Sequence, residues 1–264
     1  MCLDAFKQSR QCLVFCSSKR ATESQAEKVL KELKHSSLEL ESLANDLLGV
    51  FSSPTKQCLR LSVCIRGGVA FHHAGLHYKQ RELIELAFRK GDLFVICSTP
   101  TLAAGLDLPA FRVVVRDHKR FGLRGMNKIP VLEYKQMAGR AGRPLPDGSH
   151  TWGEAVLLAN DGLLKEELRE GFIFGEVESI FSKLAVEPVL RTYLLSLIAV
   201  GLIDTVSSAY SFFSKTFYAH QFSDMDKLEL IIFRMLQLLQ EWNMISGLVL
   251  EKKDDKKNSN NLFE

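Results

Sequence analysis

The sequence predicts an α/β fold in which a parallel β-sheet carries helices on both faces. The first observation is a set of short apolar runs, clearest at residues 12–16, 93–97 and 112–116. The second is that segments with the apolar spacing of amphipathic helices lie between these runs. Unbroken apolar runs are typical of strands buried on both faces, and alternation of strands with helices is typical of parallel sheets.

The first half of the predicted sheet domain begins with a strand at 12–16. Ser17 and Ser18 follow it and can cap an amphipathic helix over 20–34. Leucines between 38 and 48 indicate a second helix, which breaks near Ser52–Ser53–Pro54. A short strand then runs from 67 into a glycine-marked loop that ends at Leu76.

The second half repeats the alternation. The pattern predicts a helix over 79–90 that Gly91 ends, buried strands at 93–97 and 112–116, a short helix over 133–141 and a last strand at 154–159. We therefore place the sheet domain at residues 1–175, and we expect its sites where the carboxyl ends of strands meet loops.

Beyond Val177 the strand signals fade. Helical spacing at 187–200, 206–213 and 226–242, followed by a possible β element at 244–250, fits a winged-helix domain over 176–250. The polar, low-complexity tail at 251–264 is predicted to be disordered.

Composition excludes few functions. The 264 residues are 46% hydrophobic and 25% charged, as in an ordinary globular protein, and a net charge of +3 does not by itself indicate nucleic acid. No secretory signal is evident, and the longest apolar run, at 193–203, is about half a membrane span. We therefore expect a cytoplasmic protein that does not bind a membrane. The six cysteines form no C-x-x-C pair, which favours buried free thiols over a metal site.

The most informative segment reads QMAGRAGRP, from Gln136 to Pro144. Arg140 and Arg143 are three residues apart, so on a helical turn they would point the same way. Guanidinium groups are always charged and match phosphate oxygens in a bidentate fork. Two arginines among small residues therefore predict contact with a polyphosphate; the alternative is a solvated basic helix end.

A second informative segment, STPTLAAGLDLP at 98–109, follows a predicted buried strand. Ser98, Thr99 and Thr101 would expose hydroxyls and amides at the strand end and at the start of a helix. Such groups form an anion site without side-chain charge and can hold a nucleic-acid backbone by its shape. The alternative is a capped helix start inside the core.

These two segments, together with LVF at 13–15, Ser17 and FHHAGL at 71–76, resemble the second RecA-like half of Ski2-like superfamily 2 helicases. The match is closest to the archaeal HelQ-type DNA helicases. It continues through RDHKRF at 116–121 and IPVLEYKQ at 129–136, and into the second domain at 190–198 and 212–221.

The resemblance implies two sets of site residues. The first would contact the tracked strand: Phe15, Ser17, His73, Gly75, Ser98, Thr99, Thr101, Arg120 and Phe121. The second would face ATP, with Arg143 as arginine finger and Gln136 as sensor of the terminal phosphate: Gln136, Arg140, Arg143, Gly105 and Asp107. The HelQ-type pattern more often has Asn at the position of Asp107.

The connection at 117–132 is longer than usual and carries basic residues together with Phe121 and Met126. In the related helicases this stretch is a β-hairpin that splits the duplex. Basic groups can hold phosphates while an apolar tip replaces a lost base stack. The alternative is a disordered surface loop.

The phosphate loop G-x-x-x-x-G-K-S/T is absent from the sequence, as is an Asp-Glu-x-His string after a strand. Those groups hold the phosphates and Mg²⁺. We therefore expect ATP and Mg²⁺ to be held mainly by a first RecA-like domain, located in another chain or in a missing segment, so that this chain alone is inactive.

The predicted function is the C-terminal motor half of an ATP-dependent 3′-to-5′ DNA helicase that acts on single-stranded or forked DNA. Either the chain is a fragment, or the helicase is encoded as two polypeptides. Two alternatives stay open: a non-catalytic nucleic-acid-binding or adaptor remnant, and a piece of a Ski2-like RNA helicase.

Overall fold

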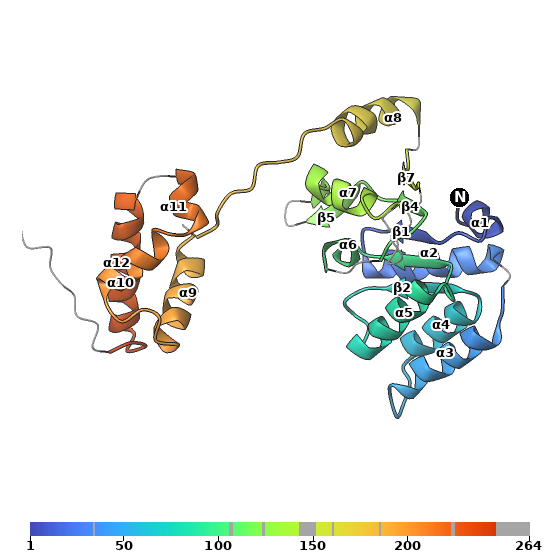
Figure 1. Ribbon diagram of the computed structural model, residues 1–264, viewed down its shortest axis with the longest axis horizontal. Helices are drawn as coiled ribbons and strands as arrows, with labels where there is room; N and C mark the ends of the chain where they lie inside the picture. The colour runs from blue at the N-terminus through green and yellow to red at the C-terminus, as the bar shows by residue number, and fades with distance from the viewer. Residues whose placement is uncertain are drawn as a thin grey trace, which may run out of the picture. The chain divides into compact units, whose positions relative to one another are not determined.

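The computed structural model describes residues 1–33, 35–105, 108–122, 125–142, 152–159, 161–184, 186–222 and 225–246. The chain divides into two compact units, Met1–Glu178 and Ser179–Glu264 (Figure 1). Each unit is described by itself.

A five-stranded parallel sheet forms the centre of the first unit. Its strands lie in the order β2-β3-β1-β4-β7. Their bounds are β1 (Cys12–Phe15), β2 (Val69–His72), β3 (Val95–Ser98), β4 (Arg112–Val115) and β7 (Glu154–Leu157). Every residue of the first four is buried. The predicted parallel α/β sheet is confirmed.

The strand order places helices on both faces. The connection from β1 to β2 crosses the sheet in the opposite direction to the later connections, and parallel crossovers are right-handed. α2 (Lys19–Glu32) and α4 (Lys56–Arg66) therefore cover one face, while α5 (Tyr78–Lys90), α6 (Thr101–Gly105) and α7 (Val131–Ala138) lie on the other. α3 (Leu38–Gly49) packs against α4 and α5 at the β2 edge.

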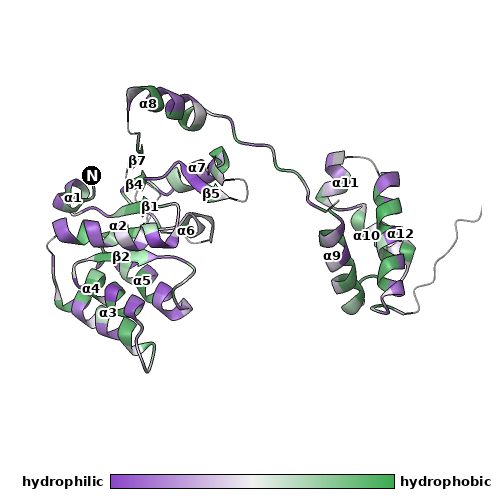
Figure 2. Ribbon diagram, turned by 180° about the vertical axis from the view of Figure 1, so that it is seen from behind, coloured by the Kyte–Doolittle hydropathy of each residue, from purple (hydrophilic) through white to green (hydrophobic). Residues whose placement is uncertain are grey.

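Local signals explain where these helices begin and end. The side chains of Ser18, Ser37 and Thr55 accept hydrogen bonds from the first turns of α2, α3 and α4. Gly91 ends α5 with φ of 89°, a left-handed conformation that glycine adopts at no steric cost. Hydrophobic residues gather where these helices meet the sheet (Figure 2).

Five elements of this unit differ from the sequence prediction. The helix predicted over 133–141 ends at Ala138. α4 had not been predicted as a separate helix, and neither had the short α1 (Cys2–Lys7) at the start of the chain. After β7, α8 (Gly162–Leu168) continues into a π-helical turn at Arg169–Ile173, and neither had been predicted.

A two-stranded antiparallel hairpin follows β4. It consists of β5 (Lys119–Gly122) and β6 (Gly125–Lys128), with Phe121 opposite Met126. The hairpin expected in this connection is therefore confirmed as a structural element.

The second unit contains α9 (Glu187–Ala199), α10 (Val206–Phe213), α11 (Phe217–Phe222) and α12 (Met225–Glu241) around its own apolar core. The predicted helices at 187–200, 206–213 and 226–242 are confirmed. The possible β element at 244–250 lies mostly outside the described residues, and 244–246 form no strand. The winged-helix assignment thus stays a prediction.

None of the described helices is both long and apolar enough to cross a membrane.

Candidate nucleic-acid interface

The carboxyl edge of the sheet brings several predicted strand contacts together. Phe15, Ser98 and His72 end three neighbouring strands and are paired in register. The chain leaves β1 and β3 toward opposite faces, which makes this edge the switch point where ligands bind in parallel α/β sheets. The following predicted residues come directly after these ends: Ser17, His73, Gly75, Thr99 and Thr101.

The segment that follows β1 is hydrogen-bonded to the segment that follows β4. The backbone N–H of Ser17 donates to Oδ2 of Asp117 at 2.8 Å. Arg116 lies 3.1 Å from Oδ1 of the same carboxylate and donates to Gln25 of α2 at 3.3 Å. Phe15 is only 1% exposed, so its ring fills the core. Because it is buried, Phe15 positions the end of β1. Ser17 is the polar residue of this segment that lies at the carboxyl edge of the sheet.

His73 shapes the loop after β2. The N–H of Gly75 donates to Nδ1 of His73 at 3.1 Å, so Nδ1 carries no proton. The proton is then on Nε2, which lies 3.2 Å from Oε1 of Glu23 in α2. Burial lowers the pKa of His73, which keeps the ring neutral. Because the His73 side chain is 1% exposed, the ring is not accessible to a ligand from solvent, and its role is to shape the loop.

Gly75 is required by this geometry. A Cβ atom at Gly75 would lie 3.0 Å from Nδ1 of His73, closer than nearly all real Cβ contacts. Glycine therefore permits the approach that makes the Gly75-to-His73 hydrogen bond, and it leaves the loop surface free of side chains at this point.

His72 points to the opposite face of the sheet. Its Nε2 lies 2.9 Å from Oε1 of Glu85 in α5, and Nδ1 has no hydrogen-bond partner among the described residues. A cavity of about 380 Å³ opens beside it, at the carboxyl end of β2. Its lining includes His72, Tyr78, Arg81, Glu82, Glu85 and Thr101. Arg81 and Glu85 could not be predicted as part of this edge, because neither belongs to a recognised motif.

Hydroxyl groups follow the end of β3. The Oγ1 atoms of Thr99 and Thr101 lie 2.9 Å apart, and Thr101 is exposed at the start of α6. The Ser98 hydroxyl donates to the Thr99 carbonyl at 2.9 Å and is buried, so it stabilises the turn. α6 has only five residues, so the hydroxyls contribute more to a polar surface here than the helix dipole does.

Arg140 differs from the sequence prediction. Since α7 ends at Ala138, Arg140 lies in the turn after the helix and not on a helical face. Its side chain is 7% exposed, and Nη2 donates to the carbonyl oxygen of Ala103 in α6. The expectation of two arginines on one helical turn is therefore wrong; the glycines end the helix, and Gly142 has a φ of 64°.

Backbone contacts join the same two segments. Ala110 donates to the Arg140 carbonyl at 3.1 Å, and Gly142 donates to the Ala110 carbonyl at 3.0 Å. Ala110 and Ala141 form an isolated parallel bridge. Hydrogen bonds thus connect the arginine motif directly to the segment between β3 and β4.

The remaining residues predicted to face ATP are described only in part. Gln136 is exposed in the last turn of α7, and Gly105 is the last residue of α6. Arg143 and Asp107 lie outside the described residues. Their roles stay predictions.

The hairpin presents apolar side chains to solvent. Phe121 is 81% exposed and Met126 is 64% exposed. At the base, Ile129 donates to the His118 carbonyl at 3.0 Å, and Lys128 pairs with Glu167. Arg120 lies 2.8 Å from Glu133 of α7. The hairpin is therefore anchored at its base while its apolar residues are uncovered.

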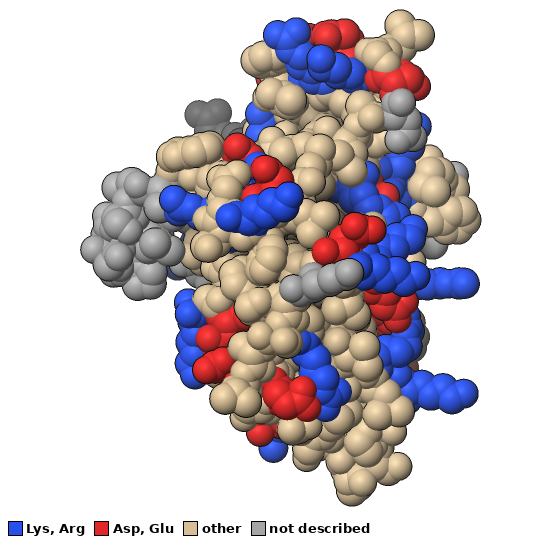
Figure 3. Space-filling model, turned by 90° about the vertical axis from the view of Figure 1, so that its right-hand side faces the viewer, with Lys and Arg blue, Asp and Glu red and all other residues tan. Residues whose placement is uncertain are grey.

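Charge is mixed on the face drawn in Figure 3, where lysine and arginine side chains are interspersed with acidic ones. This agrees with the small net charge of +3. Any basic contact with nucleic acid is therefore local.

Comparison with known proteins adds to this geometry. Residues 49–144 match the family model described as helicase conserved C-terminal domain. That range holds β2, β3, β4, the hairpin and the arginine motif.

Over that range the chain is similar to the C-terminal domain of helicases.

Similarity to complete helicases extends well beyond this domain. ATP-dependent DNA helicase Hel308 of Methanocella arvoryzae is 44% identical over 246 residues, which are 92% of this chain and 32% of that protein. The Methanococcus vannielii Hel308 is 38% identical over 275 residues, 98% of this chain and 36% of that protein. The Pyrococcus horikoshii Hel308 is 40% identical over 231 residues, covering 86% and 31%. The chain thus spans about a third of the length of the curated relatives it matches.

Several residues that shape the carboxyl edge of the sheet were not found by sequence reasoning. Asp117 accepts a hydrogen bond from the backbone N–H of Ser17, and Glu23 contacts the ring of His73. In both contacts the partners are far apart in the sequence. Asp117 directly follows a strand, and this position was the one signal that marked it. Glu23 lies on an ordinary amphipathic helix, which gave no such signal.

Proposed function

We propose that this chain is the C-terminal motor half of a Ski2-like, ATP-dependent DNA helicase that moves 3′ to 5′. The observation that supports this most is the convergence of separate motifs. Strand-end residues from β1, β2 and β3 share one edge, and the arginine motif is hydrogen-bonded to the segment after β3. The similarity to proteins named ATP-dependent DNA helicase Hel308, across 86–98% of the chain, supports the same proposal.

The strand contacts are assigned by chemistry and exposure. The hydroxyls of Thr99, Thr101 and Ser17 face the sugar-phosphate backbone, which needs donors and not base-specific groups. The N–H groups of Ser17 and Gly75 already donate to Asp117 and His73, so Gly75 contributes a point of close approach that no side chain blocks. Phe15, His73 and Ser98 are buried and hold these groups in place. Phe121 at the hairpin separates base pairs, and Arg120 supports the hairpin through Glu133.

The nucleotide is assigned to the segment that includes Gln136, Arg140, Arg143, Gly105 and Asp107. Gln136 is exposed and can reach a phosphate presented from outside this unit. ATP, when bound, supplies the phosphoryl group whose transfer to water drives movement. Arg143 contacts that phosphate as the finger, and Arg140 holds α6 against the arginine motif.

Magnesium fits a different domain. Among the described residues, no three His, Cys, Asp or Glu side chains converge in a way that could hold an ion. We propose that a first RecA-like domain, with the phosphate loop that this sequence lacks, holds Mg²⁺ and most of the ATP contacts.

The proposal is tested by reconstitution. The full chain is assayed for ATP hydrolysis alone, and then with a second polypeptide that carries the phosphate loop. The portion of the Methanocella arvoryzae Hel308 that this chain does not cover is a suitable partner. We expect background activity from the chain alone, and turnover when the partner and single-stranded DNA are both present. Robust turnover by the chain alone would refute the proposed division of the site.

Arg143→Ala in the reconstituted complex should lower turnover by roughly 10³-fold or more, as loss of a finger does. The matched control is Arg169→Ala, because Arg169 is half-exposed and its contacts, with Glu166 and the Phe174 ring, lie within adjacent turns of the chain. Single-stranded RNA of the same sequence forms a parallel arm. Activation by RNA and not DNA would favour the RNA helicase, and DNA binding without turnover would favour the adaptor.

A further inference from the structure

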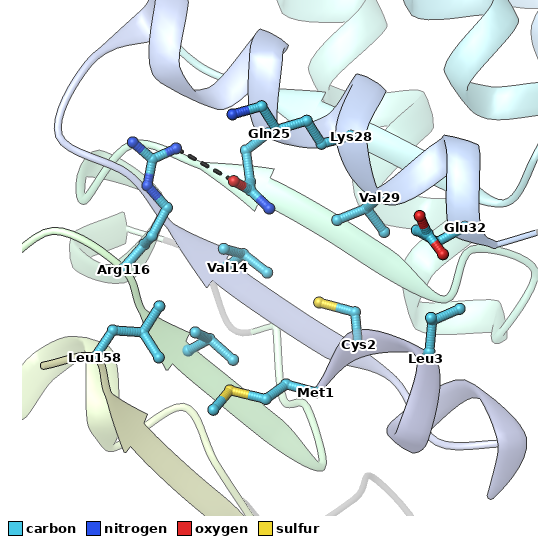
Figure 4. A pocket seen from close by; sticks show the side chains of 11 residues that line it. Met1, Cys2, Leu3, Val14, Gln25, Lys28, Val29, Glu32, Arg116 and Leu158 are labelled. Carbon is cyan, nitrogen blue, oxygen red and sulfur yellow. Dashed lines mark hydrogen bonds between the residues drawn. The ribbon is translucent and has the colours of Figure 1, made fainter. Parts of the chain in front are cut away.

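A cavity lies on the α2 face of the sheet, bounded at one end by Arg116 and Gln25, beside the segment that follows β1, and at the other by α1. It has a volume of about 420 Å³ and is lined by residues of α1, α2, β1 and β4 and by residues just beyond β4 and β7. Val14, Val29, Val114 and Leu158 form its apolar part. Figure 4 shows the Cys2 sulfur directed into this space, toward Val14. Small solutes can therefore reach a thiol on this face.

A second thiol lies beneath the first. Sγ of Cys2 is 3.8 Å from Sγ of Cys12, the first residue of β1. A disulfide has an S–S bond of about 2.05 Å, so the two sulfur atoms would need to approach by about 1.8 Å. Cys2 is the first residue of α1, a helix of only six residues, and Cys12 is the first residue of β1, so this approach requires a shift of α1 relative to the sheet.

The two thiols differ in environment. Cys2 is partly exposed, whereas Cys12 is fully buried. The hydrogen bond from Cys12, aided by the nearby Arg112 guanidinium, lowers the pKa of Cys2 against the opposing effect of burial. The same hydrogen bond, together with burial, raises the pKa of Cys12. Cys2 is therefore the attacking thiolate and Cys12 the reserve thiol.

No other pair of cysteines in the chain has this arrangement. All six cysteines lie among the described residues, and Cys2–Cys12 is the thiol–thiol contact found there. Cys16, Cys64 and Cys97 are buried, and burial raises the pKa of each, to about 12 for Cys16 and Cys64. Their thiolate populations at neutral pH are therefore very small.

We propose that Cys2 and Cys12 form an oxidisable thiol pair, a modification site that takes small hydroperoxides and closes to an intramolecular disulfide. The site is independent of the helicase proposal. It lies at the amino end of β1, while Ser17 and the strand contacts follow its carboxyl end.

The chemistry proceeds in two balanced steps. The Cys2 thiolate attacks one peroxide oxygen, forming an S–O bond as the O–O bond breaks; the departing hydroxide takes a proton and becomes water. Cys12, after losing its proton to solvent, attacks the Cys2 sulfur. An S–S bond forms, the S–O bond breaks, and hydroxide again leaves as water. One peroxide is reduced and two thiols are oxidised.

The test uses the full chain, reduced and then treated with limiting hydrogen peroxide. Remaining thiols are alkylated, and peptides are analysed by mass spectrometry. We expect the Cys2–Cys12 disulfide to form at least about tenfold faster than any oxidation at the other four cysteines, because Cys2 lines a cavity and is the thiol with a second sulfur atom 3.8 Å away. Dithiothreitol should reverse it.

Three variants separate the steps. Cys12→Ser should stop at a Cys2 sulfenic acid, which a 1,3-dione traps. Cys2→Ser should leave Cys12 as a thiol at the same dose. Cys58→Ser is the matched control. The pKa of Cys58 is also lowered, because hydrogen bonds with Thr55 and Gln80 outweigh the effect of burial, which would raise it. Among the described residues, however, no second sulfur atom contacts Cys58. This variant should form the disulfide as the wild type does.

Circular dichroism confirms that each variant is folded before treatment. Oxidation of Cys2 and Cys12 at the rate of the other cysteines would overturn the proposal. So would a wild-type chain in which Cys2 stays a sulfenic acid, or one in which Cys58 reacts first.

Discussion

Removal of the Arg140 side chain separates two roles for that residue. In the structure the guanidinium is buried and donates to the carbonyl of Ala103, which ties the arginine motif to α6. Arg140→Ala removes this donor and leaves the carbonyl without it in a buried place. If structural support is the main role, the variant loses stability as well as ATP turnover.

The expected loss follows from the contact. Hydrogen bonds from charged groups contribute about 1.5–3 kcal/mol to stability. For a domain the size of Met1–Glu178, each kcal/mol shifts Tm by about 2–4 °C. The melting temperature of the first unit should therefore fall by about 3–12 °C.

Thermal unfolding of the full chain, followed by circular dichroism, measures this shift. Arg169→Ala is again the control, since its side chain is half-exposed and its partner Glu166 is also exposed. We expect the control to change Tm by less than about 2 °C, as for most surface substitutions. An Arg140→Ala protein as stable as wild type, but inactive in the reconstituted ATPase assay, would refute the structural role and favour direct phosphate contact.

The other predictions concern pH, the hairpin and the β1 exit. Burial lowers the pKa of His72 and His73, so below about pH 6.5 the unfolded chain binds more protons than the folded one. The contribution of these histidines to stability is therefore complete above that pH, and the free energy of unfolding should fall on acidification by up to about 1.4 kcal/mol per pH unit for each histidine. Urea midpoints at pH 7.5 and 5.5 measure this fall, which should be shallower in His73→Gln. Phe121→Ala should slow strand separation of a forked duplex more than it slows ATP turnover. Leu163→Ala replaces another highly exposed apolar side chain and should change neither rate. Equal losses of both activities in Phe121→Ala would contradict the duplex-splitting role. Asp117→Ala removes the acceptor of the Ser17 N–H and should lower the free energy of unfolding of the first unit by about 1–3 kcal/mol. Asp46→Ala, at an exposed position, should leave it unchanged. Identical urea midpoints for Asp117→Ala and the wild type would contradict the assigned contact.

The sheet was predictable because its strands are short, apolar and separated by helical patterns. The residues after β1, β2 and β3 could be placed at one edge for the same reason, since carboxyl ends of parallel strands meet there. The hairpin came from family resemblance and not from its residues, whose exposed apolar side chains are not typical of a strand.

The misses have physical causes. α4 was missed because Pro54 suggested a break, and because its buried face includes Cys58, Ser62 and Cys64 while Leu59 and Val63 are exposed. The burial of Arg140 was not predictable, because it depends on a carbonyl in α6 from 37 residues earlier in the chain. Spacing in a sequence indicates which side chains share a helical face, but not where glycines end that helix.

The ion pair between Arg120 and Glu133 connects the hairpin to α7, the short helix that also carries Gln136. Under the proposed function, this contact links the segment that would meet the fork to the residue that would sense the terminal phosphate. Weakening it should then uncouple ATP turnover from strand opening while leaving the hairpin and Gln136 intact.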